Sequence, residues 1–352
     1  MNLPLQPPVE PMLANLSRDM PIGETWLYEP KWDGFRTVVF WDGQDMLLQS
    51  RDQKPLGRYF PELEKGLREV LPPGCVLDGE IVIVGPHGLD FDALSLRIHP
   101  AESRVRMLAA DMPSSLVAFD LLCADGEDLS GQPQGLRRER LEAFLSPRPP
   151  LFLTPATRDP DMARQWFERF EGAGLDGVVA KDVRQPYAPG RRIMVKVKHQ
   201  RTADCVVGGF RWLRGHEGKA VGSLLLGLYD DDGVLHHVGH TSSFKAAEKQ
   251  ALVGRLEPYR DPTGSASYGS GRTPGGPSRW RSDVDQQWES LRPELVCEVA
   301  FEHLQGDRFR HAATFSRWRP DKPPRDCNYH QLEATVPYLL DDIFKAGTGQ
   351  TT

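Results

Sequence analysis

Lysine, arginine and carboxylate side chains stand beside glycine in several short segments whose composition suits phosphate chemistry. The first segment is Lys31–Arg36, with the sequence KWDGFR. Gly34 lets the backbone approach a ligand closely, and Arg36 offers a forked donor for phosphate or ribose oxygens. An isolated lysine at such a place is as a rule a solvated surface charge. Lys31 becomes a candidate nucleophile only if nearby cations, a metal ion or desolvation favour its neutral amine.

A pair of lysines near residue 197 shows strand periodicity. Ile193, Val195 and Val197 fall on one face of a predicted strand, and Lys196 and Lys198 fall together on the other. Two neighbouring ammonium groups repel each other unless an anion lies between them. The pattern therefore indicates either a phosphate clamp or the solvated edge of a strand.

Four further segments carry polar or aromatic candidates, and each also has an ordinary structural interpretation. The sequence LDGEIV contains Glu80 and resembles a turn that enters a strand. The sequence AFDLL contains Phe119, which by its type alone would be a core aromatic. The sequence LDGVVAK contains Asp176, and FSRWRPDK contains Arg319 and Lys322 in what could be a basic strand end.

The elements that must position these residues in the first 200 residues are mixed α and β. Asp42-Gly43 between two apolar runs predicts a hairpin. Apolar runs predict strands at 37–41, 46–49, 75–84, 116–122, 177–181 and 193–198. Helical spacing predicts helices at 57–70, 135–145 and 160–171. The proline-rich first 24 residues are expected to run over the surface.

After about residue 200 the pattern changes to short strands. Strands are predicted at 205–210, 223–228, 234–239, 295–301 and 312–318. A helix at 243–257 and a Gly/Pro/Ser-rich loop at 262–280 interrupt them, and a last helix is predicted at 330–345. Five strands and one helix favour a small barrel of the OB-fold type, which commonly binds nucleic acid.

The whole chain of 352 residues is long enough for two domains of ordinary size. Its formal charge of −6 argues against a protein that coats nucleic acid through bulk positive charge, although local basic faces stay compatible with binding. The five cysteines are scattered and odd in number, which indicates neither a zinc site nor a disulfide framework. Neither a signal peptide nor a membrane span is evident, so a cytoplasmic protein without membrane contact is expected.

Taken in order, the motifs resemble those of the covalent nucleotidyltransferase superfamily, and among its members the ATP-dependent DNA ligases. The resemblance extends from about Pro11 to Asp326, and the run Val195–Asp204 resembles the small two-domain bacterial ligase C type. It implies an α+β nucleotidyltransferase domain of antiparallel sheets with flanking helices at 1–200. An OB-fold barrel with a C-terminal helix would then follow at 201–352.

The resemblance also implies roles for the nucleotide-binding residues. Lys31 would attack the α-phosphate of ATP and carry AMP covalently. Glu29 would read the adenine amino group, and Phe119 would stack on the base. Lys196 and Lys198 would hold the α-phosphate.

The remaining site residues would contact the phosphates, the ribose or a divalent metal. Contacts to the nucleotide or to the 5′-phosphate of a nick are implied for Arg36, Arg51 and Arg191. Glu80 would contact the ribose and support the metal site, and Asp176 would bind Mg²⁺ or Mn²⁺ where most ligases have glutamate. The pair Arg319 and Lys322 would orient the departing pyrophosphate.

The implied function is the sealing of nicked or broken duplex DNA in bacterial DNA repair. A monomer is expected, in the cytoplasm and associated with the nucleoid when on DNA, with repair polymerases as candidate partners. An RNA ligase or a capping-type guanylyltransferase would share the same motifs. A non-catalytic OB-fold protein that binds nucleic-acid ends is the alternative from another class, although it would have no need of Lys31.

Overall fold

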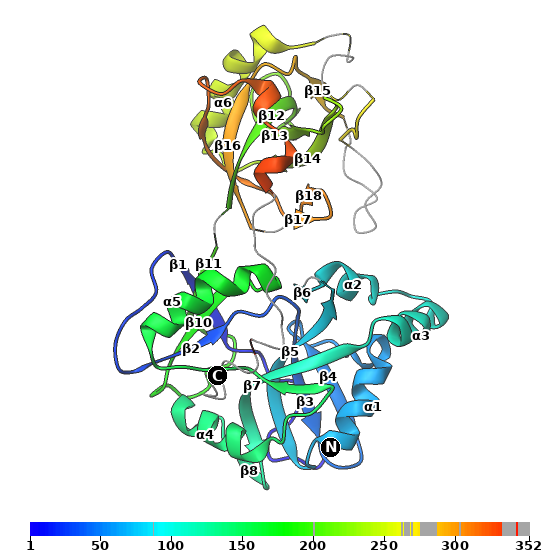
Figure 1. Cartoon of the computed structure of the whole chain (residues 1–352), viewed down its shortest axis with the longest axis vertical. Coiled ribbons are helices and arrows are strands. Elements are labelled where there is room, and N and C mark those ends of the chain that lie inside the picture. Colours follow the sequence, from blue (N-terminus) through cyan, green and yellow to red (C-terminus); the bar gives the residue numbers. More distant parts are fainter. Residues whose placement is uncertain are drawn as a thin grey trace. The chain divides into compact units, whose positions relative to one another are not determined.

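The computed structural model of the protein describes residues 1–86, 88–199, 201–261, 263, 268, 270–274, 287–302, 304–332 and 343. The chain forms two compact units, the first of residues 1–199 with 335–352 and the second of residues 200–334. Each unit has its own sheets (Figure 1) and its own apolar core.

The larger sheet of the first unit has seven strands along the path β4-β3-β5-β7-β8, with β6 beside β5 and β9 beside β7. The strands are β3 Phe35–Trp41, β4 Met46–Ser50, β5 Cys75–Gly85, β6 Gly88–Leu89, β7 Ser114–Ala124, β8 Glu127–Asp128 and β9 Leu151–Leu153. The predicted hairpin is confirmed, because β3 and β4 pair antiparallel on either side of Gly43. The positive φ of Gly43, +99°, is a conformation that glycine adopts readily.

The smaller sheet of the first unit has four strands in the order β1-β11-β10-β2. The strands are β1 Leu13–Ser17, β2 Trp26–Pro30, β10 Gly177–Asp182 and β11 Arg192–Lys198. The strand β1 pairs parallel with β11, whereas β10 pairs antiparallel with both of its neighbours.

The N-terminal segment corrects one expectation, since it does not simply run over the surface. Leu3, Val9 and Met12 are buried in a common cluster. The Val9 N–H donates to the Gln49 side chain, and the Met12 N–H donates to the Tyr187 hydroxyl. These long-range hydrogen bonds satisfy backbone groups that a proline-rich segment cannot pair within itself.

The helices of the first unit cover the two sheets. They are α1 Pro61–Val70, α2 Phe91–Leu96, α3 Glu102–Asp111, α4 Gln134–Phe144 and α5 Pro160–Arg169, with 3₁₀ turns at Gly57–Tyr59 and Phe170–Ala173. Leu63 and Leu67 of α1 are buried in the core of the larger sheet. Trp166 of α5 packs in a separate core with Tyr28 and Val178 of the smaller sheet.

The second unit is a barrel of five principal strands in the order β14-β13-β12-β16-β19, with β15 (Glu289–Ser290) beside β12. The strands are β12 Arg201–Trp212, β13 Val221–Tyr229, β14 Leu235–Thr241, β16 Val296–Phe301 and β19 Thr314–Trp318. A bridge between Thr241 and Ala313 joins the end of β14 to the start of β19, so the two ends of the sheet meet. This strand order, with one helix between the third and fourth principal strands, confirms the predicted OB-fold.

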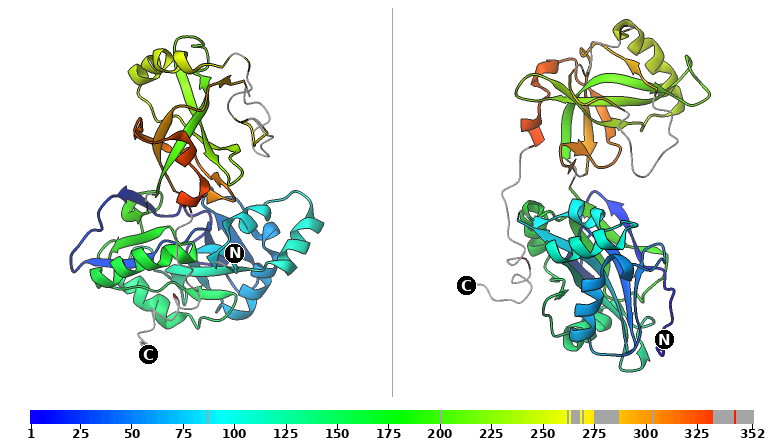
Figure 2. Two further views of the ribbon diagram at one scale, coloured as in Figure 1. Left: turned by 45° about the horizontal axis from the view of Figure 1, so that its top comes forward. Right: turned by 90° about the vertical axis from the view of Figure 1, so that its right-hand side faces the viewer.

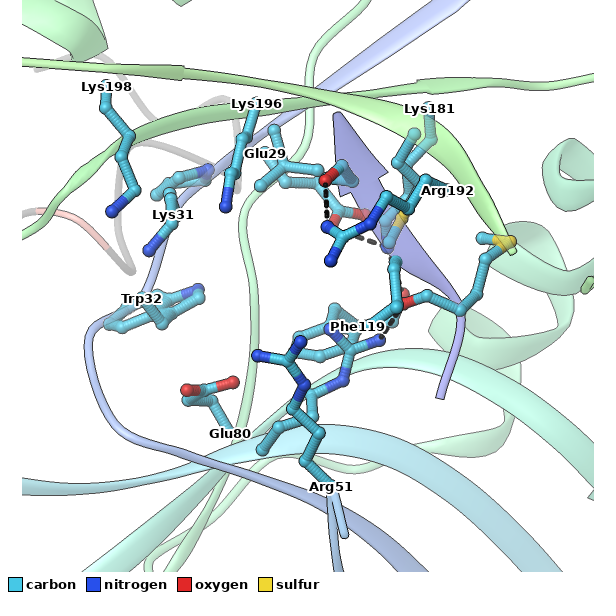
Figure 3. A pocket seen from close by; sticks show the side chains of 17 residues that line it. Glu29, Lys31, Trp32, Arg51, Glu80, Phe119, Lys181, Arg192, Lys196 and Lys198 are labelled. Carbon is cyan, nitrogen blue, oxygen red and sulfur yellow. Dashed lines mark hydrogen bonds and ion pairs between the residues drawn. The ribbon is translucent and has the colours of Figure 1, made fainter. Parts of the chain in front are cut away.

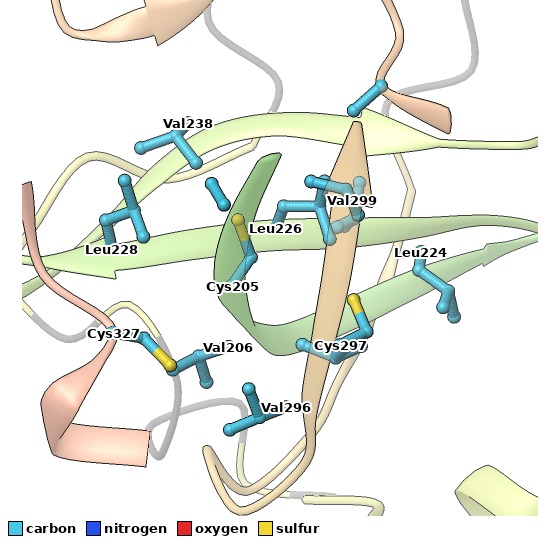
Figure 4. Packing of buried hydrophobic residues seen from close by; sticks show 14 of the residues in the cluster. Cys205, Val206, Leu224, Leu226, Leu228, Val238, Val296, Cys297, Val299 and Cys327 are labelled. Atoms are coloured by element: carbon cyan, nitrogen blue, oxygen red, sulfur yellow. The ribbon is translucent and has the colours of Figure 1, made fainter. Parts of the chain in front are cut away.

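Smaller elements complete the second unit. The helix α6 (Ala246–Leu256) lies against the barrel (Figure 2). Its buried residues Leu252 and Leu256 belong to the barrel core. The others are the hairpin β17 Leu304–Gln305 with β18 Arg308–Phe309 and the 3₁₀ turns Glu257–Tyr259, Pro324–Asp326 and Tyr329–Leu332. The barrel core holds Cys205, Cys297 and Cys327 among aliphatic side chains (Figure 4).

The five cysteines are buried and reduced in this structure. In the part of the chain that the structure describes, no helix has the length and apolar character to cross a membrane. Most of the predicted loop at 262–280 and of the predicted helix at 330–345 lies outside the described residues. Ile343, within that last segment, is buried in the core of the first unit.

Candidate active site

A cavity of about 290 Å³ lies in the first unit and receives side chains from both sheets. Eight predicted site residues line it, namely Glu29, Lys31, Arg36, Arg51, Glu80, Phe119, Lys196 and Lys198. Its cationic lining residues are Lys31, Arg36, Arg51, Lys181, Arg192, Lys196 and Lys198, whereas its acidic ones are Glu29 and Glu80. This excess of positive charge suits a polyanionic ligand such as a nucleoside triphosphate.

Lys31 follows β2 and is fixed by backbone hydrogen bonds to the start of β10. Its N–H donates to the Gly177 carbonyl over 2.8 Å, and its carbonyl accepts from the Asp176 N–H over 3.0 Å. Its ammonium group forms an ion pair with the Asp176 carboxylate, and Lys198 Nζ lies 3.0 Å from the same oxygen. In Figure 3 the amines of Lys31, Lys196 and Lys198 gather at one end of the cavity.

Two glycines permit the close backbone approaches around Lys31. A Cβ atom at Gly34 would lie 2.2 Å from the Ile81 carbonyl oxygen, and one at Gly177 would lie 2.0 Å from the Val197 carbonyl oxygen. Gly177 also has a φ of +133°. No side chain fits at either position without moving the backbone.

The strand β11 places a row of side chains in the cavity. Arg192, Met194, Lys196 and Lys198 all line it, as expected for alternate residues of one strand. Arg191, which was predicted to contact the nucleotide, is exposed and not among the described lining residues, and the adjacent Arg192 lines the cavity instead. Extending the alternation of the lysine pair to residue 192 could have identified this arginine.

Lys181 joins two of the predicted base-contacting residues, although its role was not foreseen. Its Nζ lies 2.8 Å from a carboxylate oxygen of Glu29 and donates to the Phe119 carbonyl over 3.0 Å. The same nitrogen lies 4.8 Å from the centre of the Phe119 ring. Lys181 and Glu29 are both buried, so their pairing fixes the carboxylate that was predicted to read adenine.

A second support for Glu29 comes from α4. The Arg138 guanidinium lies 3.5 Å from Glu29 and donates to the Thr154 carbonyl over 2.9 Å. The Thr154 hydroxyl accepts a hydrogen bond of 2.8 Å from the indole N–H of Trp32, which follows Lys31 in the chain. The segment that carries Lys31 is thereby connected to the group that holds Glu29.

Arg36 is held by partners within the protein. Its guanidinium donates two hydrogen bonds of 2.6 Å to the two oxygens of Asp78, which is fully buried. The Tyr187 hydroxyl donates to the same carboxylate over 2.6 Å. The Arg36 guanidinium also lies over the Phe119 ring, 4.4 Å from its centre. Arg36 therefore positions the ring as well as lining the cavity.

The two predicted metal ligands differ in their surroundings. Burial raises the pKa of Glu80 to about 7, although Arg36 and Lys31 oppose this shift. Asp176 is paired with two lysines. Among the described residues, no group of three or more His, Cys, Asp and Glu side chains is arranged to hold a metal. Two carboxylates nevertheless fit Mg²⁺, which keeps water ligands and shares the oxygens of bound phosphates.

Arg319 and Lys322 belong to the second unit, just after β19. Both line a cavity of about 770 Å³ between the end of α6 and the start of β16. Arg319 is surrounded by the carboxylates of Asp204, Glu298 and Asp321. These two cations are thus brought together in one cluster of the barrel.

Comparison with known proteins covers nearly the whole chain. The family model for the ATP dependent DNA ligase domain matches residues 11–198, and that for the ATP dependent DNA ligase C terminal region matches residues 217–322. DNA ligase C1 of Mycolicibacterium smegmatis is 47% identical over 355 residues, covering 98% of this chain and 99% of that protein. DNA ligase C of Mycobacterium tuberculosis is 48% identical over 360 residues, covering 97% and 99%.

A solved structure of a Lig E DNA ligase shares the fold, with a TM-score of 0.56 at 19% identity over 88% of this chain and 99% of that one. The two family models match the sheet-rich first unit and the barrel unit in turn. Together with the high identity to complete ligases, they show that the chain belongs to the ATP-dependent DNA ligases, in the group of the bacterial ligase C type.

Proposed function

We propose that this ligase takes AMP from ATP onto Lys31 and uses it to join a 3′-hydroxyl and a 5′-phosphate at a nick in duplex DNA. The observation that carries the proposal is the arrangement of the cavity. Lys31 lies at one end beside Lys196 and Lys198, and Lys181 joins Glu29 to Phe119 in the same cavity, where the base would bind. A nucleotide with its base at Phe119 would extend its α-phosphate toward the three lysines.

In the first step the neutral Lys31 amine forms a bond to the α-phosphorus of ATP. The bond from that phosphorus to the bridging oxygen breaks, pyrophosphate leaves with the electron pair, and the Lys31 nitrogen gives one proton to solvent. Lys196 and Lys198 bind the α-phosphate oxygens and offset the charge that develops there. A bound Mg²⁺ or Mn²⁺, held by Glu80, Asp176 and phosphate oxygens, would supply further positive charge and compete with Lys31 for Asp176.

The base-binding end selects adenine in this proposal. Lys181 and Arg138 hold the Glu29 carboxylate so that it can accept a hydrogen bond from the adenine amino group. Guanine has a carbonyl oxygen at the same position. Neither this oxygen nor the Glu29 carboxylate carries a proton, so no hydrogen bond can form between them. Phe119, whose ring is contacted by Arg36 and Lys181, would stack on the base.

The next two steps transfer the activated phosphate to DNA. The 5′-phosphate of the nick attacks the AMP phosphorus, the bond to Lys31 breaks, and a 5′–5′ pyrophosphate linkage forms. The 3′-hydroxyl then attacks the 5′-phosphate, a phosphodiester forms, and AMP leaves. Arg51 and Arg192, which line the same cavity and are exposed, would bind the incoming 5′-phosphate.

We extend the proposal to bacterial DNA repair by a monomer in the cytoplasm. A nick is what remains after a repair polymerase has filled a gap, so such a polymerase is the candidate partner. Size-exclusion chromatography with light scattering tests the monomer. Loss of the protein from its host should increase sensitivity to DNA damage, and an unchanged sensitivity would contradict the repair role.

The direct test uses ATP labelled at its α-phosphate, followed by peptide mapping of the labelled protein. The label is expected on Lys31, with pyrophosphate released in equal amount. A label at another lysine would contradict the site, and labelling by GTP alone would indicate a guanylyltransferase.

A panel of nicked DNA, gapped DNA and RNA-containing duplexes then identifies the substrate. Sealing is expected for nicked DNA. Preference for RNA ends would indicate an RNA ligase, and binding of ends without any labelling would indicate a non-catalytic end-binding protein.

A further inference from the structure

The segment that carries Arg319 and Lys322 is held by acidic residues of its own barrel. One nitrogen of the Arg319 guanidinium, Nη1, lies 2.8 and 3.0 Å from the two oxygens of Asp204 on β12. The other two nitrogens bind Asp321 over 2.8 to 3.1 Å. Glu298 on β16 adds a third carboxylate, 3.6 Å from Nη1. Each side of the guanidinium fork therefore faces a carboxylate of the same unit.

Lys322 is held much less tightly than Arg319. Its Nζ lies 4.0 Å from Asp204, at the limit of an ion pair. Its side chain is 32% exposed, against 18% for Arg319. A flexible ammonium group beside one distant carboxylate can turn toward a phosphate at little cost, whereas a guanidinium bound on both sides must first break several charged hydrogen bonds.

Asp204 is itself fixed in place on the barrel. Its N–H donates to the Gln331 side-chain oxygen over 2.8 Å, and its carbonyl accepts from the Gln331 side-chain amide nitrogen over 3.0 Å. The Arg319 N–H donates to the Val296 carbonyl over 2.9 Å, which fixes the backbone where the segment leaves β19. The geometry of the pair is thus determined from both sides.

We propose that Asp204 is a positioning residue for adenylylation. Its carboxylate holds the Arg319 guanidinium in place, and the segment fixed in this way orients Lys322 as the cation that contacts the leaving pyrophosphate. This inference rests on the proposed function, because it gives Arg319 and Lys322 separate roles in the first chemical step. It assigns Arg319 a role different from that of a direct phosphate contact.

The test measures two steps separately in Asp204→Asn. Single-turnover formation of the lysyl-AMP from labelled ATP should fall roughly 10-fold to 100-fold, the range for loss of a charged hydrogen-bonded pair. Sealing of a DNA nick that already carries AMP should change less than about threefold, since a small effect is expected where the pair is not needed. Asp204→Glu, which keeps the carboxylate, should form lysyl-AMP faster than Asp204→Asn does.

A double-mutant cycle distinguishes an indirect role of Arg319, which acts through Asp204, from a direct contact between Arg319 and phosphate. If Arg319 acts through Asp204, then Arg319→Met and Asp204→Asn should each slow adenylylation, and the double variant should be no slower than Arg319→Met alone. Multiplicative effects would overturn the proposal. So would an unchanged or faster adenylylation in Asp204→Asn, which would mean that the carboxylate restrains Arg319 instead of positioning it.

A matched control is available in the same barrel. Asp307 also forms a two-oxygen pair with an arginine, Arg272, but away from the Arg319 segment. Asp307→Asn should leave adenylylation unchanged. Equal loss of both steps in Asp204→Asn, or a slowed adenylylation in Asp307→Asn, would show a general effect on the barrel and overturn the proposal. Absence of lysyl-AMP in the unaltered protein would instead refute the proposed function itself.

Discussion

The cavity of the first unit and the Arg319 cluster of the second unit both gather charged side chains, but the balance of positive and negative charge differs. Among the described residues, seven cations and two acids line the cavity. The Arg319 cluster contains Arg317, Arg319 and Lys322 against Asp204, Glu298 and Asp321. An excess of positive charge favours the binding of an anion, whereas balanced charge holds a segment in a fixed conformation.

The difference also appears in how the cations are held. Lys31 and Lys198 both pair with one buried carboxylate, Asp176. In the barrel each arginine of the cluster has a carboxylate partner within 3 Å. The comparison predicts that substitutions in the cavity disable chemistry, and that substitutions in the barrel cluster affect one step selectively.

The largest effect is expected for Lys31→Ala, which removes the proposed site of adenylylation. Lysyl-AMP formation and nick sealing from ATP should both fall below detection, because no neighbouring lysine lies in the same backbone position. Labelling with α-phosphate-labelled ATP measures this. Lys65→Ala, on the exposed part of α1 and away from the cavity, serves as the control. Continued labelling of the Lys31 variant would show that another residue carries AMP and would contradict the proposed site.

Lys198→Ala should reduce adenylylation by about 10² to 10³-fold, the range for loss of one preorganised charge at a reacting group. The change removes a proposed phosphate contact and one of the lysines that pair with Asp176. Rapid-quench measurement of lysyl-AMP formation gives the rate. Lys198→Arg keeps the charge and should retain more activity. An effect no larger than that of an exposed lysine would contradict the phosphate clamp.

Lys322→Ala should slow adenylylation by roughly 10-fold to 100-fold, a range typical of one charge-assisted hydrogen bond. Sealing of a pre-adenylylated nick should change much less, because pyrophosphate has already left. The two rates are measured on the same preparation. Equal losses in both assays would contradict a role confined to the first step, and with it the contrast between cavity and cluster.

The smallest effect is expected for Lys181→Met, which removes the charge that holds Glu29 and Phe119 while keeping much of the side-chain volume. The KM for ATP should rise about tenfold, as for loss of a buried charged contact worth about 1.4 kcal/mol. Discrimination between ATP and GTP should decrease, with kcat nearly unchanged. A lower kcat with unchanged KM would indicate that Lys181 serves the chemistry instead of base binding.

Much of the cavity was predictable because its motifs combine residue types with local conformation. Gly34 and Gly177 mark places where the backbone leaves no room for a side chain, and the alternation of β11 aligns Lys196 with Lys198. The fold class and the family followed from the same motifs and their order. The short helix α2 was missed because six residues carry too little periodicity to be recognised.

Contacts between distant segments were beyond prediction. The pairing of Lys181 with Glu29 depends on β10 lying beside β2, and no local pattern reports that register. Arg138 and Thr154 lie outside every motif, yet they connect Glu29 to Trp32. The buried N-terminal residues, such as Met12 in the cavity wall, were hidden in a proline-rich stretch that resembled a surface segment.

The sequence alone determined the family and the fold class, because the ordered lysine, glycine and carboxylate motifs and the short strands of the OB-fold barrel are each encoded in short stretches of residue types and spacing. Only the tertiary structure decided how those groups are held. It paired Lys31 with Asp176, placed Lys181 behind Glu29 and bound Arg319 to Asp204. Such pairings follow from strand register and packing between residues far apart in the chain, and the strength of a charge in a protein depends on those neighbours.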